Sequence, residues 1–211
     1  MGIAERRERE RGQRRNAIID SAESVFFSKG LDAATMDDVA ERAELSKGTL
    51  YLYFKSKEDL YLAIHLRGNR ILKRMFQNAV ELHQIGLNKV RAIGQAYFEF
   101  YRKYPDYFNA MIYYESHHID HSDENSTAME CLFEGKAILE VVVDALVFGI
   151  KDGSIRPGID PVKTAVILWG QSTGMIQIAA LKKDILEYGF QINDAELIEY
   201  SFELIRKSLE N

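Results

Sequence analysis

The sequence predicts an all-helical protein, with a small helix-turn-helix segment at the N-terminus and a larger helical bundle after it. Strand-like alternation of apolar and polar residues is nearly absent from the 211 residues, whereas helix caps, glycines and prolines mark helix ends throughout. With 46% hydrophobic and 28% charged residues, the composition is typical of a globular protein and not of a disordered chain.

The N-terminal segment contains three short predicted helices. Residues 16–29 form the first, because apolar side chains recur on one face of it. Thr35 and Asp38 have the spacing of a capping box at the start of the second helix. Ser46 is the predicted cap of the third helix, which covers residues 47–54.

Further helices follow residue 56, and their ends are marked by caps, prolines and one polar loop. Asp160 is predicted to cap the penultimate helix, with Pro161 at its first position, where a missing N–H costs nothing. The markers in this part of the chain are, in order, Ser56, Leu82, Pro105, the polar loop 117–126, Lys151, Asp160 and Asn193.

The composition argues against several classes of protein. Cys131 is the only cysteine, so no disulfide forms within the chain and no CxxC metal or redox pair is present. The N-terminal residues are too charged for a secretory signal. The most apolar segment, residues 164–181, contains Gln171, Ser172 and Gln177 and is predicted to be a buried helix, not a membrane span. We therefore expect a cytoplasmic protein that does not enter a membrane.

The second and third predicted helices, with a short break between them, have the dimensions of a helix-turn-helix. When Leu50 points into the core, Gly48 faces outward at about 160° from it, between Thr49 and Tyr51. A position without a side chain lets the helix backbone approach a phosphate or a base edge. The free amides at the helix N-terminus add attraction for anions. The alternative is a solvated polar surface with a tolerated glycine, which explains each residue but not the combination.

A specific family resemblance is carried by residues 35–60. The segment reads Thr35-Met-Asp-Asp-Val-Ala-Glu-Arg-Ala43, then Ser46-Lys-Gly-Thr-Leu-Tyr51, Tyr53-Phe54 and Ser56-Lys57-Glu-Asp-Leu60. It resembles the DNA-binding domain of the TetR family of bacterial transcriptional repressors, over roughly residues 16–64.

The resemblance implies contacts with a double-stranded DNA operator. Lys47 and the backbone of Gly48 would enter the major groove, where Lys47 can donate to guanine. The residues implied to contact phosphates are Thr35, Ser46, Thr49, Tyr51, Tyr53 and Lys57. Glu44 departs from the family, which commonly has Gly at this turn position, and would bear a steric cost if the turn requires a positive φ.

The resemblance also implies three regions. Residues 1–15 are a basic, flexible N-terminal arm, residues 16–56 the DNA-binding domain, and residues 57–211 the effector-binding and dimerisation domain. The arm contains six Arg and three Glu, so it could follow the DNA backbone or minor groove, or be a frayed tail that only adds charge.

A homodimer is implied because family members bind near-palindromic sites as two-fold dimers. The penultimate helix is the candidate interface, since glycines four residues apart allow another helix to come close. Its candidate residues are Ile167, Gly170, Gly174 and Ile178. The alternative is that these residues only fill the core of one subunit.

Aromatic residues are concentrated in residues 97–114, which contain nine Tyr and Phe. Tyr suits a pocket for an aromatic or amphipathic effector, although ordinary core packing would use the same residues. The candidate pocket residues are Tyr97, Tyr101, Tyr104, Phe108 and Tyr113. A weaker metal hypothesis rests on His117, His118 and His121, which fit a solvated loop better, and no cofactor is predicted.

These observations predict a ligand-responsive, sequence-specific DNA-binding regulator. It would be a repressor, released from a near-palindromic operator by a small-molecule effector of unknown identity. No P-loop or Rossmann glycine pattern is present, so we do not expect an enzyme. The alternatives are a metal-responsive regulator that uses the loop 117–121 and, more remotely, a small helical enzyme.

Overall fold

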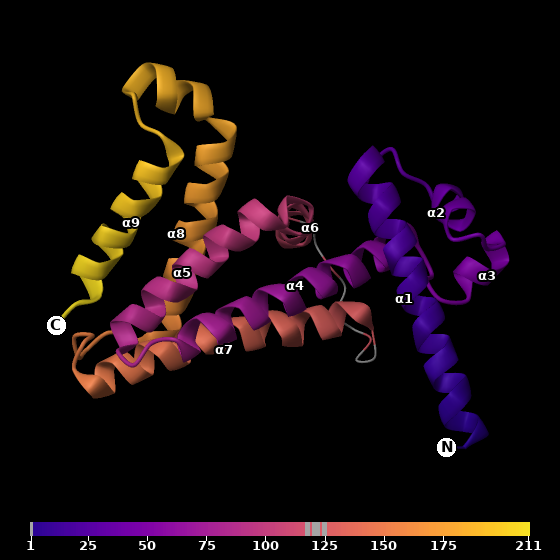
Figure 1. The fold of residues 1–211 in the computed structure, drawn as a ribbon, viewed down its shortest axis with the longest axis horizontal. Helices are drawn as coiled ribbons and strands as arrows, with labels where there is room; N and C mark the ends of the chain where they lie inside the picture. Colours follow the sequence, from indigo (N-terminus) through magenta and orange to yellow (C-terminus); the bar gives the residue numbers. More distant parts are fainter. Residues whose placement is uncertain (1, 117–118, 120–122, 124–125) are drawn as a thin grey trace. The chain divides into compact units, whose positions relative to one another are not determined.

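The computed structural model describes residues 2–116, 119, 123 and 126–211. In this part of the chain all regular elements are helices, which confirms the predicted fold class (Figure 1). They are α1 (Ile3–Lys29), α2 (Met36–Arg42), α3 (Lys47–Tyr51), α4 (Lys57–Glu81), α5 (Gly86–Lys103), α6 (Pro105–Ser116), α7 (Thr127–Asp152), α8 (Pro161–Leu181), the π-helix η1 (Ile185–Gly189) and α9 (Asp194–Leu209).

Two predicted boundaries were wrong. Helix α1 begins at Ile3, far before residue 16, because the Gly2 N–H donates to Glu5 Oε2 at 2.8 Å and local charge pairs support the first turns. Helix α3 ends at Tyr51 instead of residue 54. Its ladder changes there to i→i+3 bonds, with the Tyr53 N–H donating to the Leu50 carbonyl at 3.0 Å.

The predicted caps are present, because each depends only on residues close in sequence. Thr35 and Asp38 exchange hydrogen bonds as a capping box at the start of α2. Asp160 Oδ1 accepts the N–H groups of the second and third residues of α8, at 3.0 and 3.1 Å. Asn193 and Glu196 form a second capping box at the start of α9.

The chain divides into two compact units. Unit 1 contains residues 1–68 and 106–132, and unit 2 contains residues 69–105 and 133–211. Helices α4 and α7 each contribute to both. Unit 1 therefore joins the three N-terminal helices to most of α6, and Ala110 of α6 belongs to the same buried cluster as Ile18, Val39 and Leu50.

A polar network ties α1, α4 and α6 together in unit 1. Arg67 Nη1 of α4 donates to Asp20 Oδ1 at 2.6 Å and to Glu23 Oε2 at 2.9 Å. The Tyr107 hydroxyl of α6 donates to Glu23 Oε1 at 2.7 Å. One carboxylate of α1 thus receives a hydrogen bond from each of the other two helices.

Nearby, the buried imidazole of His65 stacks on Tyr114, with ring centroids 4.3 Å apart. Desolvation lowers the pKa of His65 to about 4, so this side chain is neutral at physiological pH.

In unit 2, α5 and α7 meet through two glycines. A Cβ on Gly86 would lie 2.1 Å from the Gly149 Cα, so the two backbones are in direct contact. The Gly86 N–H donates to Asp152 Oδ2 at 2.7 Å, and the Leu87 N–H donates to Ser154 Oγ at 3.1 Å. The start of α5 is therefore capped by the side chains of the last residue of α7 and of a residue just beyond it.

The glycine contact predicts a strong effect of one methyl group. Gly86→Ala should destabilise the protein by about 1–3 kcal/mol, because a backbone cannot move aside as a side-chain tip can. Gly135→Ala is the control: it lies in α7 with open space around its Cβ position, and should gain about 0.5–1 kcal/mol. Urea unfolding followed by circular dichroism compares the two, and equal midpoints would contradict the contact.

Candidate nucleic-acid interface

The outward face of α3 is bare at its centre. Leu50 is completely buried and anchors the helix, whereas Gly48 is exposed and a Cβ there would meet nothing within 4 Å. Packing within unit 1 therefore does not require a glycine at this position. Leu52 is 77% exposed just after the helix, and Tyr51 is 44% exposed.

Two hydroxyls lie at the N-terminus of α3. Ser46 Oγ caps the helix by accepting the Thr49 N–H at 3.2 Å, and it is 2.8 Å from Thr49 Oγ1. Thr35 Oγ1 is occupied in the same way at the start of α2, where it bonds to Asp38 Oδ2 at 2.8 Å. Tyr53 is half-buried and packs on the unit 1 core. Local hydrogen bonds therefore position the hydroxyls of Ser46, Thr49 and Thr35 before any ligand binds.

Lys47 is held by an acid that the sequence reasoning did not identify. Its ammonium is 2.7 Å from Asp37 Oδ1, and both side chains are well exposed. The hydrogen bond to Asp37 raises the pKa of Lys47. Asp37 lies in the first turn of α2, and only the angle between α2 and α3 brings it to Lys47. A base contact by Lys47 requires it to leave this carboxylate or to share it.

Lys57 has an internal role that the sequence reasoning also missed. Its ammonium donates to the backbone carbonyls of Leu31 at 2.8 Å and Ala34 at 3.3 Å. The side chain therefore fastens the loop between α1 and α2 to the start of α4. An ammonium has three N–H groups, so one remains for the predicted phosphate contact.

The turn between α2 and α3 has the geometry that the family resemblance implies. Glu44 has φ 55°, in the left-handed region where glycine is favoured. The suspected steric cost of Glu at this position is therefore real.

The five candidate pocket residues are divided between the two units. Tyr97, Tyr101 and Tyr104 belong to unit 2, and Phe108 and Tyr113 belong to unit 1. Tyr97 is buried, and its hydroxyl is 2.8 Å from Thr173 Oγ1. Tyr113 meets the Tyr61 ring edge-on, with centroids 5.1 Å apart. At least these two side chains have packing roles of their own.

Helix α8 is exposed, which corrects the expectation that residues 164–181 are buried. Only 22% of its most apolar window is buried, although the helix has the length and hydropathy of a membrane span. Ile167 and Ile178 are 58% and 53% exposed, and the Cβ positions of Gly170 and Gly174 are open. The helix is apolar on a side that its own chain does not cover.

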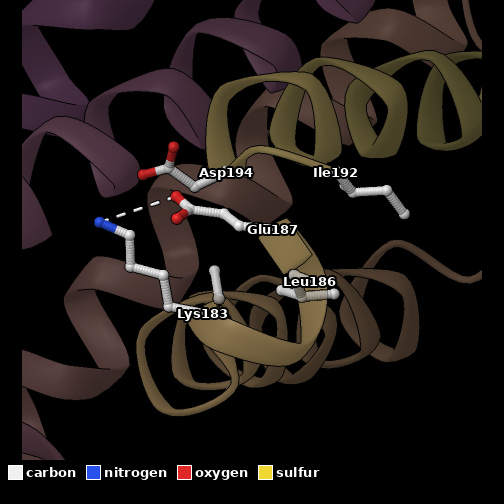
Figure 2. A pocket seen from close by; sticks show the side chains of 6 residues that line it. Lys183, Leu186, Glu187, Ile192 and Asp194 are labelled. Carbon is white, nitrogen blue, oxygen red and sulfur yellow. Dashed lines mark ion pairs between the residues drawn. The ribbon is translucent and has the colours of Figure 1, made fainter. Parts of the chain in front are cut away.

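A shallow hollow lies where α8, η1 and α9 follow one another in unit 2 (Figure 2). It encloses about 210 Å³ of space open to solvent, and Lys183 Nζ is 3.7 Å from Glu187 Oε1 at its edge. The lining residues are Ala179, Lys183, Leu186, Glu187, Ile192 and Asp194. Its small size and charged edge do not suit the aromatic or amphipathic effector expected from the sequence, and η1 has no sequence signal that would have located it.

His117, His118 and His121 lie outside the residues that the structure describes. Among the described residues, no three His, Cys, Asp or Glu side chains are grouped as a metal site.

Comparison with known proteins gives consistent matches. Residues 18–64 match the family model described as bacterial regulatory proteins, tetR family. The transcriptional activator FasR of Mycolicibacterium smegmatis is 37% identical over 90 residues, which are 43% of this chain and 41% of FasR. The regulator YhgD of Bacillus subtilis is 32% identical over 74% of this chain and 78% of YhgD.

The transcriptional repressor KstR2 of Rhodococcus jostii is 30% identical over 70% of each protein. Among solved structures, the regulator FadR from Bacillus subtilis in complex with stearoyl-CoA has a TM-score of 0.67 and 18% identity, and the match covers 91% of this chain and 97% of FadR. At 18% identity, the similarity to FadR shows a shared fold and nothing more.

The Lys47–Asp37 pair predicts that an acid limits DNA affinity. Asp37→Asn should tighten binding to duplex DNA about three- to tenfold, because it releases Lys47 and removes a negative charge near phosphates. Glu41→Gln removes the same charge from α2 without a contact to Lys47. Fluorescence anisotropy with labelled duplex measures both, and an equal gain in the two variants would mean that the ion pair itself has no effect.

Proposed function

Because the chain belongs to the TetR family of bacterial transcriptional regulators, we propose that it is a cytoplasmic, ligand-responsive repressor that binds a near-palindromic operator as a homodimer. The observation that carries the DNA-binding part is the bare outward face of α3 at Gly48. The regions keep their proposed roles: residues 16–56 bind DNA, and residues 57–211 bind the effector and form the dimer.

Contact with DNA would proceed from the start of α3. Gly48 leaves the backbone accessible, and the neighbouring Lys47 reads base edges once it leaves Asp37. The hydroxyls of Ser46 and Thr49 and the partly exposed Tyr51 would contact phosphates and so fix the position of the helix in the groove. Thr35, Tyr53 and Lys57 would add phosphate contacts from neighbouring elements.

The dimer would form through the exposed apolar side of α8. Single exposed apolar residues are common, but a contiguous set on one helix marks an interaction surface. Gly170 and Gly174 lie among these residues and would let the partner helix approach closely. The exposed apolar residues of α8 and α9 include Val162, Val166, Ile167, Ile178, Leu181, Tyr200 and Leu204.

The effector would be an apolar or amphipathic small molecule. This proposal is supported by aromatic pairs along α5 and at its end: the ring of Phe98 contacts that of Tyr101, and the ring of Phe100 contacts that of Tyr104. FadR, which has a similar fold, was solved in complex with stearoyl-CoA. We assign the binding region to Tyr97, Tyr101 and Tyr104 of unit 2.

Effector binding would be transmitted through α6. Its Tyr107 donates to Glu23 of α1, and Arg67 of α4 donates to the same carboxylate. A shift of α6 would therefore move Tyr107 relative to Glu23 and change a contact with α1, in the unit that contains α3. Such a shift would bias the dimer toward a separation of recognition helices that no longer matches the operator.

The test of the DNA-binding proposal is Gly48→Leu. The variant should fold with equal or greater helix stability, because space around the Cβ is open. It should lose about 100-fold or more in affinity for promoter fragments selected genome-wide by the wild-type protein, because the side chain holds the backbone away from DNA. Gly135→Leu in α7 is the control and should bind normally. Wild-type affinity of Gly48→Leu would refute the assignment.

The dimer proposal is tested by charge on the α8 surface. Ile167→Glu combined with Ile178→Glu should convert the dimer to monomers, because carboxylates at an apolar interface cannot be hydrated. Sedimentation velocity gives the mass. Leu82→Glu, which changes a residue that is 80% exposed at the end of α4, should leave a dimer. A double variant that stays dimeric would place the interface elsewhere.

A further inference from the structure

The N-terminal part of α1 is helical but does not pack on the core of unit 1. Every residue from Gly2 to Arg14 is exposed, and the first buried residue of the helix is Ile18. In Figure 1 this indigo end extends beyond the short helices α2 and α3. At 1.5 Å per residue, residues 3–15 form a rod about 20 Å long.

One face of this rod is lined by arginines. Arg7, Arg11 and Arg14 have i, i+4 and i+7 spacing, which places them within about 60° of one another around the helix. Arg15 follows at the edge of the same face, and its guanidinium lies 4.9 Å from the centroid of the Phe54 ring. Because Phe54 comes three residues after α3, this contact places the C-terminal end of the arginine face, at Arg15, beside the proposed DNA-binding segment.

Two acids of the helix are engaged by groups outside the arginine face. Glu10, at the edge of the arginine face, pairs with Arg6 at 2.8 Å, and Glu5 caps the helix through the Gly2 N–H. Among the residues that the structure describes, Arg7, Arg11 and Arg14 form no ion pair. Like charges four residues apart, as at Arg7 and Arg11, do not stabilise a helix.

We propose that the Arg7, Arg11 and Arg14 face of α1 binds backbone phosphates of operator DNA beside the site of α3, and that it does so as a helix. This inference rests on the proposed function. Guanidinium groups form strong, charge-assisted hydrogen bonds with phosphate oxygens. Arg7 and Arg14 lie about 10 Å apart along the axis, so the face spans about three base pairs of duplex.

Two matched double variants test which face binds. Arg7→Gln with Arg11→Gln removes two charges from the arginine face, and Arg6→Gln with Arg9→Gln removes two that lie about 100° and 160° from Arg7 around the helix. Phosphate contacts are independent of sequence, so a labelled random-sequence duplex serves as the probe. Between about 50 and 200 mM salt, the first variant should lower the slope of log affinity against log salt by about 2, and the second by well under 1.

A proline variant separates helical geometry from charge. Gly12→Pro keeps every arginine but costs about 3 kcal/mol in a helix interior, so it should lower the salt slope as the first double variant does. Gly12→Ala is its control and should bind at least as well as the wild type. If Gly12→Pro binds normally, residues 3–15 act as a flexible tail and the proposal is overturned.

The remaining outcomes are equally decisive. Equal slopes for the two double variants, with wild-type protein bound to DNA, would overturn this inference and leave the proposed function intact. Wild-type protein without affinity for any promoter fragment would instead refute the proposed function. Loss of binding to anionic phospholipid vesicles, with DNA binding unchanged in the arginine variants, would assign the face to a membrane surface and overturn the proposal.

Discussion

The burial of Leu50 and Phe54 is the interaction on which the proposed DNA-binding surface depends. Helix α3 has five residues, and a helix of this length is not stable by itself in water. Both side chains are almost fully buried in the same cluster as residues of α1, α2 and α6. Once they are fixed, the opposite side of α3 must face outward, so Gly48 needs no stabilising role of its own and is available for contact with a ligand.

Local chemistry explains which features could be predicted from the sequence. The caps at Thr35, Ser46, Asp160 and Asn193 involve residues two or three positions apart, so sequence spacing alone reveals them. The partners of Lys47 and Lys57 were missed because they come from other elements and depend on packing angles. The exposure of α8 was missed for a related reason: apolar composition is the same for a helix buried by its own chain and for one available to a second chain.

Charge is distributed so that attraction for an anion is local. The chain has a net charge of −5, yet the arginine face of α1 and the segment from Ser46 to Lys57 contain no acid that neutralises them from within. The acid that does reach this surface is Asp37, from a different helix. Overall charge therefore opposes nonspecific association with nucleic acid, while two small surfaces favour it. Such a balance increases the share of binding energy that depends on correct docking.

The conformation of Glu44 has a consequence for how proteins of this kind diverge. Its left-handed backbone is enclosed by two hydrogen bonds, from the Glu44 N–H to the Glu41 carbonyl at 3.1 Å and from the Leu45 N–H to the Ala40 carbonyl at 2.9 Å. Neither neighbouring helix can grow through this residue, and an inserted or deleted residue would break both bonds. Side chains on α3 can therefore be exchanged without disturbing the turn, whereas a change in the length of the turn would break its hydrogen bonds.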